Sequence, residues 1–400
     1  MTFFADFRVF LIHICVMEEL SSFYLIYPLG LAHNGLLELQ EKWAIHFPEA
    51  PLEILSVDEA GLLIKVKTKE GFALNHILRS PTRILLRVAE FKARDFPKLF
   101  QKISKLPWKN LMIGGTPEVE VAATNSRLFD SRKIEKAIHD GLAENYRKQP
   151  VKKKYLDHLE LNKTSALPKI YYRAVDDVIT ISLDTTGEML HFRGEKIFTG
   201  LAPIRENLAT LLLKSLTKNL TDSDYTLIDP MCGSGTFLIE AHDAYKVNFE
   251  RSFSYEHTPY WIDFAAKKPF LESFKSGTNN LFSKYLGFEI NKDVVALAKK
   301  NAKDKNIEFE QGDIFNSNEV VLNKNLVVIN PPYGIRVGEK SDINLDFYKR
   351  IIESVKKKFD PERIGIIVPE EYHFNPKASD TLSRFQFKNG GLSVVFYVLK

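Results

Sequence analysis

In the C-terminal half of the chain, short and mostly apolar runs alternate with stretches of helical periodicity. Three of these runs end at Asp229, Glu289 and Asn330, and the segment before Asp313 is predicted as a further strand. Strands separated by helices are typical of an α/β doubly wound parallel sheet. Because the carboxyl ends of parallel strands meet at one edge, we expect the four polar residues to gather there as a ligand site.

The N-terminal half shows a different pattern, with period-two alternation in several short segments. It predicts the strands Leu62–Thr68, Pro117–Ala123, Ile170–Ile181 and Val178–Asp184. It also predicts helices at Asp95–Lys105 and at Asp130–His139, the latter with Asp130 or Ser131 as N-cap, and a helix at Asn75–Leu86 feeding the strand Arg83–Ala89. Helical periodicity also marks residues 18 to 50. Together these elements predict two small α+β pieces that end near residue 185.

The most informative stretch is Leu227–Ala241, which predicts a strand, a Gly233-Ser234-Gly235 turn and a helix from Thr236. Glycines let the backbone approach a ligand more closely than any side chain would allow. A phosphate-binding P-loop would need a lysine at the start of this helix, and a dinucleotide fingerprint would need a third glycine where Leu238 stands. The remaining interpretation is a turn that binds S-adenosyl-L-methionine (SAM).

Downstream strand ends supply partners for such a cofactor. Glu289, followed by Ile290, stands where a carboxylate can accept both ribose hydroxyls. Asp313, followed by Ile314, stands where it can accept the adenine amino group. The predicted cofactor-binding residues are therefore Asp229, Gly233, Gly235, Thr236, Glu289, Ile290, Asp313, Ile314 and Asn330.

The fourth strand ends in Asn330-Pro331-Pro332-Tyr333, and this loop is the predicted catalytic site. The tetrapeptide resembles the signature of SAM-dependent methyltransferases that modify exocyclic amino groups of bases. On this interpretation the Asn330 side-chain oxygen and the Pro331 carbonyl accept the amine N–H groups, which directs the nitrogen lone pair toward the methyl group. Pro332 helps to stiffen the loop, and Tyr333 offers a face on which an extruded base can stack.

Composition adds constraints on partners and location. The chain has 400 residues, 44% of them hydrophobic, and a formal charge of +4, so any nucleic-acid surface must be a local patch. Its two cysteines exclude a disulfide framework and a cysteine zinc site, and we expect Cys232 to be a buried residue rather than a nucleophile. The apolar residues 1–17 are interrupted by charges and are too short to span a bilayer. We expect a cytoplasmic protein that needs no metal and binds no membrane.

The N-terminal half resembles a THUMP domain, an RNA-binding module of RNA-modifying enzymes. Thr124–Asp130 carries the resemblance, and Ile181–Gly194 is similar to the junction of that module with its methyltransferase. Between them lies a basic run that contains Lys152, Lys153 and Lys154. Such a run is either a solvated connector or a set of phosphate contacts that position RNA without reading its sequence.

The long insertion at residues 245 to 285, with the pattern Arg-x-Phe-x-Tyr-Glu from Arg251, resembles that of guanine-N2 methyltransferases acting on the ribosomal large subunit. Its aromatic residues and His257 are predicted to be structural. The resemblance covers roughly residues 50 to 400 and also suggests Arg336 as a substrate contact. Some relatives carry a second methyltransferase domain at the C-terminus. The present sequence contains only the first such sheet, so a single activity is expected here.

The resemblance implies three segments. Residues 1–17 are an unassigned extension, residues 18–185 a ferredoxin-like and THUMP RNA-binding region, and residues 186–400 a Rossmann-like class I SAM methyltransferase with a seven-stranded sheet and a reversed terminal hairpin. It implies N2-methylation of a guanosine in 23S rRNA. Three alternatives stay open: a tRNA guanine-N2 methyltransferase, an adenine-N6 DNA methyltransferase, and an RNA-binding assembly factor without activity.

Overall fold

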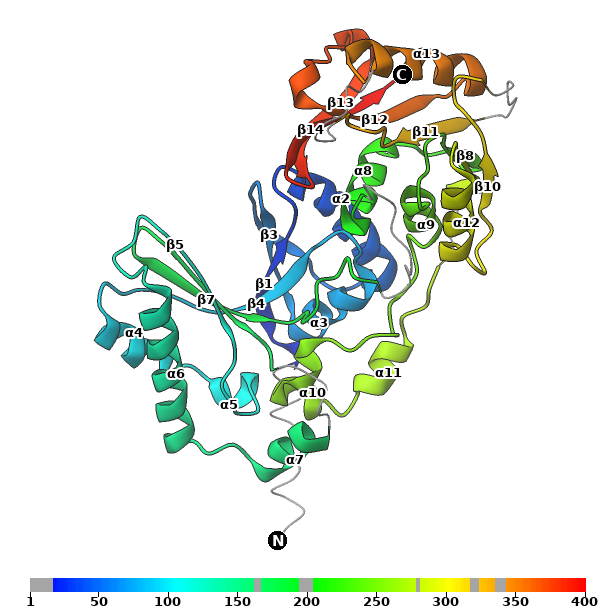
Figure 1. The fold of residues 1–400 in the computed structure, drawn as a ribbon. Coiled ribbons are helices and arrows are strands. Elements are labelled where there is room, and N and C mark those ends of the chain that lie inside the picture. Colours follow the sequence, from blue (N-terminus) through cyan, green and yellow to red (C-terminus); the bar gives the residue numbers. More distant parts are fainter. Residues whose placement is uncertain (1–16, 162–166, 194–203, 278–280, 317–323, 335–342) are drawn as a thin grey trace.

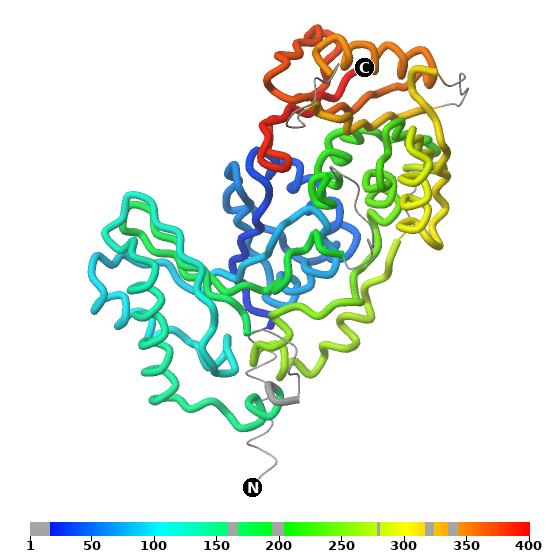
Figure 2. Tube along the Cα trace, in the orientation of Figure 1, coloured from blue at the N-terminus to red at the C-terminus, as the bar shows by residue number. Residues whose placement is uncertain are grey.

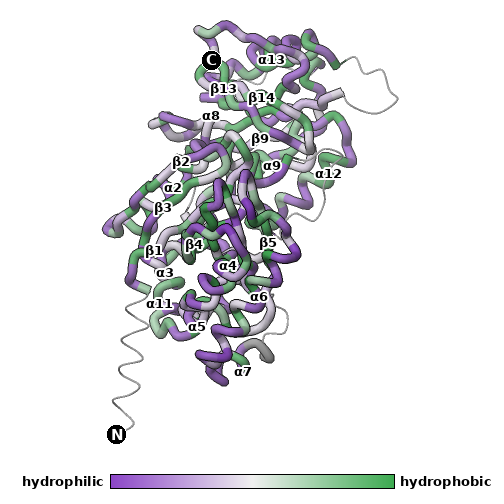
Figure 3. Tube along the Cα trace, turned by 90° about the vertical axis from the view of Figure 1, so that its left-hand side faces the viewer, coloured by the Kyte–Doolittle hydropathy of each residue, from purple (hydrophilic) through white to green (hydrophobic). Residues whose placement is uncertain are grey.

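The computed structural model describes residues 17–161, 167–193, 204–277, 281–316, 324–334 and 343–400. These residues form two seven-stranded sheets, one in each half of the chain (Figure 1). The strands carry much of the buried hydrophobic side-chain surface, whereas the helix α6 (Ser131–Lys148) alternates between buried apolar and exposed polar residues. This pattern is that of a helix lying on a sheet with one face toward solvent. Hydrophilic and hydrophobic residues are mixed along the chain trace in Figure 3.

The N-terminal sheet has the strand order β2-β3-β1-β4-β7-β6-β5 and is antiparallel except between β5 and β6. Pairing of β4 with β7 joins the two predicted α+β pieces into this single sheet. The strands are β1 (Leu20–Ile26), β2 (Glu53–Val57), β3 (Gly61–Lys67), β4 (Arg83–Lys92), β5 (Val119–Thr124), β6 (Ile170–Val175) and β7 (Val178–Asp184). The other helices of this half are α2 (Ala32–His46), α3 (Thr68–Ile77), α4 (Phe96–Ile103), α5 (Trp108–Leu111) and α7 (Lys153–Leu161).

Three sequence predictions in this half are wrong. The single strand expected at Ile170–Ile181 is broken by a turn at Asp176 and Asp177, so that β6 ends at Val175 and β7 begins at Val178. The helix expected at Asn75–Leu86 is instead the end of α3, which stops at Ile77; Pro81 lies within the predicted range and cannot continue a helix. The segment 18 to 50 contains strand β1 before its helix. In contrast, Asp130 is confirmed as the N-cap of α6, where its side chain accepts a hydrogen bond from Lys133 N.

The C-terminal sheet has the order β10-β9-β8-β11-β12-β14-β13, with β14 antiparallel to its neighbours. The predicted reversed hairpin is therefore confirmed. Its strands are β8 (Tyr225–Asp229), β9 (Phe282–Glu289), β10 (Glu308–Gln311), β11 (Asn325–Ile329), β12 (Arg363–Pro369), β13 (Thr381–Asn389) and β14 (Leu392–Leu399). The helices of this half are α8 (Glu206–Leu216), α9 (Thr236–His242), α12 (Lys292–Asn301) and α13 (Leu345–Phe359), and short 3-10 helices lie at η2 (Glu370–Tyr372) and η3 (Ala378–Asp380).

The insertion between β8 and β9 packs against the N-terminal half (Figure 2). It contains η1 (Ser254–His257), α10 (Pro259–Ile262) and α11 (Lys267–Glu272). Tyr255 is fully buried, stacks on Phe72 with ring centroids 4.7 Å apart, and hydrogen-bonds His76 Nε2 through its hydroxyl at 2.6 Å. His257 is also buried and contacts His158 of α7. Tyr255 and His257 thus have the structural role expected, and the insertion joins the two halves.

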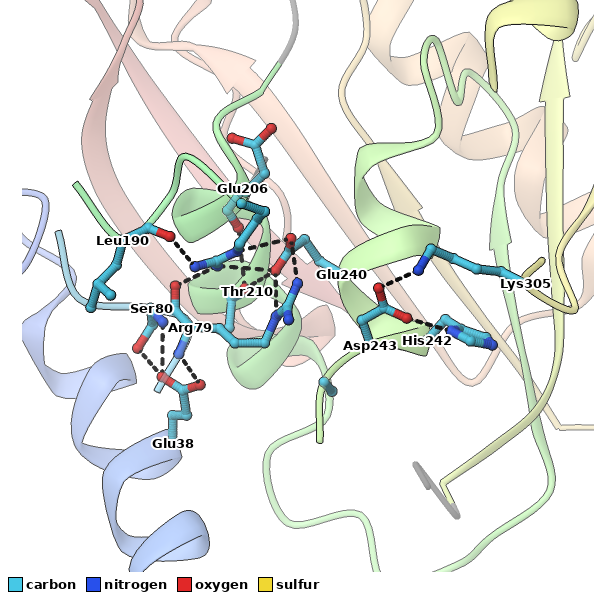
Figure 4. A network of polar contacts seen from close by, with 12 residues as sticks. Glu38, Arg79, Ser80, Leu190, Glu206, Thr210, Glu240, His242, Asp243 and Lys305 are labelled. Carbon is cyan, nitrogen blue, oxygen red and sulfur yellow. Dashed lines mark hydrogen bonds and ion pairs between the residues drawn. The ribbon is translucent and has the colours of Figure 1, made fainter. Parts of the chain in front are cut away.

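A buried polar network makes a second connection between the halves (Figure 4). Glu240 on α9 accepts hydrogen bonds from Arg79 Nη2 at 2.9 Å and Arg79 Nε at 3.0 Å, and from Arg193 Nη2 at 3.2 Å. Thr210 on α8 donates to the same carboxylate at 2.8 Å. The two guanidinium groups hold the pKa of Glu240 down to about 2 despite complete burial. Because α9 follows the glycine turn directly, this network ties the predicted cofactor turn to the N-terminal half.

Candidate active site

The glycine turn has the conformation that its sequence requires. Gly233 has a φ of 52° and Gly235 a φ of 85°, both in the left-handed region that favours glycine. A Cβ on Gly235 would lie 2.8 Å from the Phe309 ring, so this glycine allows close packing of the turn on the sheet. A Cβ on Gly233 would meet nothing within 4 Å. Gly233 therefore leaves open space at the cavity described next.

A cavity of about 730 Å³ lies at the carboxyl edge of β8, β9, β10 and β11. All the predicted catalytic and cofactor-binding residues except Gly235 line it: Asp229, Gly233, Thr236, Glu289, Ile290, Asp313, Ile314, Asn330, Pro331, Pro332 and Tyr333. Phe315 and Phe347 add aromatic surface to the same wall. Four strand ends thus meet as the sequence predicts, and the volume is that of a small-molecule site.

Three acidic side chains, Asp229, Glu289 and Asp313, line the cavity. Asp229 is 2% exposed, and burial, followed by the nearby charge of Glu289, raises its pKa to about 8, although Met231 N donates to it at 3.1 Å. Glu289 accepts from Gly233 N at 3.2 Å and from Asn291 N at 3.0 Å. These bonds fix the Glu289 carboxylate against the glycine turn. Asp313 is likewise held by Phe315 N at 2.9 Å.

The donor set suits an adenosine ligand with a cationic centre. Fixed carboxylates can accept ribose hydroxyls and an exocyclic amine, and they attract positive charge. Ile290 and Ile314 stand beside these acids on the cavity wall, where apolar side chains can contact a planar ring. Together with the open space at Gly233, these features fit SAM.

The Asn330–Tyr333 loop is held by hydrogen bonds from three later elements. The Tyr333 hydroxyl donates to Asn330 Oδ1 at 2.7 Å and accepts from Asn389 Nδ2 at 2.9 Å. Tyr348 donates to Pro332 O at 3.0 Å, and Tyr372 donates to Tyr333 O at 3.2 Å. Tyr348, Tyr372 and Asn389 were not predicted from the sequence, because each is separated from the loop along the chain and carries no motif of its own.

The remaining predicted residues lie elsewhere. Lys152, Lys153 and Lys154 are all exposed, and Lys154 forms an ion pair with Asp263 of the insertion. Arg336 lies outside the described residues. Cys232 is 6% exposed, which confirms the predicted burial, and burial raises the pKa of its thiol.

Comparison with known proteins gives two family matches that follow each other along the chain. The model of the THUMP domain matches residues 93–184. The model described as the RMKL-like methyltransferase domain matches residues 193–395, more than half of the chain. The chain belongs to this family. Its C-terminal sheet and glycine turn are accordingly those of a methyltransferase domain preceded by a THUMP domain.

Two relatives illustrate the family. The chain is 27% identical to the ribosomal RNA large subunit methyltransferase K/L of Colwellia psychrerythraea over 83% of this chain and 47% of the relative. It is 31% identical to YpsC of Bacillus subtilis over 70% of this chain and 74% of that protein. The chain spans about half the length of the K/L relatives that it matches.

A solved structure, SMU.472 complexed with SAH, has the same fold. It superposes with a TM-score of 0.70 at 23% identity, covering 96% of this chain and 98% of the other. Within the described parts of our chain, no helix is long and apolar enough to cross a membrane. Those same parts contain no group of three or more histidine, cysteine or acidic side chains arranged to hold a metal ion.

Proposed function

We propose that the protein is a SAM-dependent methyltransferase that methylates the exocyclic N2 amine of a guanosine in 23S rRNA. One observation carries the proposal: the Asn330–Tyr333 loop and the acidic cofactor positions on three neighbouring strand ends open into one cavity. A methyl donor and an amine acceptor can therefore be held side by side.

The cofactor is assigned to the turn side of this cavity. Glu289, already bonded to Gly233 N, would accept the ribose hydroxyls, and Asp313 would accept the adenine amine. Asp229 would add a polar carboxyl group beneath the turn. When bound, SAM supplies the electrophilic methyl group. By binding the adenosine part of the cofactor, the acidic residues would fix the position of this methyl group.

The reaction needs an acceptor for the amine rather than a strong base. Asn330 Oδ1 and the Pro331 carbonyl would accept the two N–H groups of the guanine amine and so direct its lone pair toward the methyl carbon. A nitrogen–carbon bond then forms as the sulfur–carbon bond breaks, and the nitrogen releases one proton to water. Positioning and electrostatics account for such a transfer without a covalent enzyme intermediate.

The substrate assignment rests on the family. The THUMP match supports RNA, and the K/L relatives, whose names give ribosomal RNA of the large subunit, favour rRNA. The preference for guanine N2 rests on the sequence resemblance of the tetrapeptide and the insertion. A tRNA guanine-N2 activity would use the same residues and is the principal competing assignment.

Asn330→Ala tests the catalytic assignment. We expect SAM binding to be retained in titration calorimetry and methyl transfer to RNA to fall at least a hundredfold, because the variant keeps the turn, Glu289 and Asp313 and loses the amine acceptor. Wild-type turnover in this variant would refute the role of Asn330. Absence of SAM binding by the wild-type protein would refute the proposed activity altogether.

A further inference from the structure

The Tyr333 hydroxyl lies between two asparagine side chains that are far apart in the sequence. It donates to Asn330 Oδ1 at 2.7 Å and accepts from Asn389 Nδ2 at 2.9 Å. The three groups therefore form a chain of hydrogen bonds with one direction, from Asn389 through Tyr333 to Asn330. Its last member is the oxygen that we assign to the substrate amine.

Asn389 is fixed in place by the hairpin that carries it. It is the last residue of β13, is 7% exposed, and precedes Gly390 and Gly391 in the left-handed turn to β14. The hairpin is also braced from outside, because a Cβ on Gly30 would lie 2.6 Å from the carbonyl oxygen of Gln386. The donor end of the hydrogen-bond chain is therefore held by the sheet and by its contact with the N-terminal half.

We propose that Asn389 is a positioning residue for the methyl-transfer reaction: through the Tyr333 hydroxyl it fixes the Asn330 amide with its oxygen as the acceptor for the substrate amine. This inference rests on the proposed function. Asn389 of the terminal hairpin thereby helps to position the catalytic loop, and the Tyr333 hydroxyl has a role in addition to the stacking surface of its ring.

The chemistry of the amide explains why such fixing matters. An asparagine side chain presents an acceptor on one side and a donor on the other, and rotation by half a turn exchanges them. In the orientation that the structure gives Asn389, its Nδ2 donates to the Tyr333 oxygen, so the tyrosine hydroxyl turns its proton toward Asn330. That proton selects the Asn330 oxygen. One of the two lone pairs of this oxygen then remains available to the substrate amine.

Burial keeps this arrangement intact over the working pH range. Burial raises the pKa of Tyr333 to about 12, so its hydroxyl retains its proton. The ring also packs against the hydrophobic core, which restricts its motion. Both observations are consistent with a permanent donor at Asn330 Oδ1.

Asn389→Asp is the sharpest test, because it keeps the size of the side chain and replaces the donor by an acceptor. The Tyr333 hydroxyl should then turn its proton toward the new carboxylate, and the Asn330 amide loses its restraint. We expect kcat for methyl transfer to fall about tenfold, the loss of one hydrogen bond of about 1.4 kcal/mol. The dissociation constant for SAM should not change. Asn389→His, which can still donate, should restore part of the rate.

The decisive comparison repeats Asn389→Asp in a Tyr333→Phe background. If Asn389 acts through the Tyr333 hydroxyl, Asn389→Asp should not lower kcat any further in protein that already carries Tyr333→Phe. Equal losses in both backgrounds would overturn the proposal, as would an unchanged rate in Asn389→Asp. Asn325→Asp is the matched control: Asn325 is 1% exposed in the same sheet and donates to Phe359 O at the opposite end of β11. We expect it to lower stability without lowering kcat of the folded protein.

A measurement that does not depend on activity separates this inference from the proposed function. In protein labelled with ¹⁵N at asparagine side chains, Asn389→Asp and Tyr333→Phe should each shift the side-chain amide signals of Asn330, and Asn325→Asp should not. Unshifted Asn330 signals would overturn the relay even if the enzyme methylates RNA. Shifted signals in a protein that methylates no RNA would uphold the relay geometry and refute the function.

Discussion

Glu240→Gln should destabilise the protein more than any other single change in the network between its halves. Glu240 is 2% exposed and holds the guanidinium groups of Arg79 and Arg193, whose side chains are 6% and 7% exposed. The substitution keeps the shape of the side chain and removes its charge. The two buried guanidinium groups lose the carboxylate that they share, and the single oxygen of the new amide cannot accept the five hydrogen bonds that Glu240 receives.

The expected loss in the free energy of unfolding for Glu240→Gln can be obtained in two ways. Removing one partner of a buried ion pair costs about 3–5 kcal/mol, since the remaining charge is left uncompensated. The pKa of Glu240 is lowered from an ordinary 4.5 to about 2. At about 1.4 kcal/mol for each tenfold change in acidity, this corresponds to roughly 3 kcal/mol. Because the pKa is lower in the folded state, this stability is present above pH 4.5 and is lost as the pH falls toward 2.

Urea unfolding at pH 7, followed by tryptophan fluorescence and far-ultraviolet circular dichroism, measures the effect. Arg193→Met is the comparison, because Glu240 then still binds both Arg79 nitrogens and Thr210. We expect its cost to be less than half that of Glu240→Gln. A loss of under about 1 kcal/mol for Glu240→Gln, or one no larger than that of Arg193→Met, would show that the network does not stabilise the junction as argued.

Three further predictions concern the turn, the buried acid and the basic run. Gly235→Ala should lower the free energy of unfolding by at least about 2 kcal/mol, because the new methyl group meets the Phe309 ring. Gly233→Ala should lower it by about 1 kcal/mol and mainly weaken SAM binding. Urea unfolding measures the first effect and titration calorimetry the second. The pKa of Asp229 is raised from 3.8 to about 8, so the contribution of this one group to stability is greatest below pH 3.8 and is lost as the pH rises through 8. Asp229→Asn should therefore gain urea resistance relative to wild type across that window while weakening SAM binding, and a constant difference from about pH 4 to about pH 9 would contradict this. Lys152→Ala with Lys153→Ala should weaken RNA binding and reduce the salt dependence of log K by up to about 0.7–0.9 for each RNA phosphate that is no longer neutralised, with unchanged unfolding; an identical salt slope would assign these lysines to a solvated connector.

Local chemistry made much of the catalytic half predictable. The absence of a lysine after Gly235 and of a glycine at Leu238 excluded two ligand classes from the amino-acid order alone. Strand ends in a parallel sheet must then share an edge, so the positions of Glu289, Asp313 and Asn330 followed from their order along the chain. The N-cap Asp130 was predictable because an N-cap is determined by residues within one turn of the helix start.

Features that depend on distant contacts could not be predicted. The sequence pattern of residues 18 to 50 indicates a helix and misses strand β1. The strand forms by pairing with residues far along the chain: Ile26 lies opposite Gly61, and Phe23 lies opposite Leu86. Asn389 acquires its partner only when the hairpin folds beside the loop. Lys154 belongs to a run that suggests RNA, yet it pairs with Asp263, 109 residues away. A charge pattern alone carries no information about such a partner.

We propose that this chain transfers methyl groups from SAM to guanine N2 in 23S rRNA. The most direct measurement incubates the protein and labelled SAM with separate pools of unmodified 23S rRNA, tRNA and DNA, followed by nucleoside analysis. We predict N2-methylguanosine in 23S rRNA alone, and its loss in Asn330→Ala. N2-methylguanosine in tRNA would move the same chemistry to another RNA. N6-methyladenine in DNA, or no methylated nucleoside in any pool, would contradict the account.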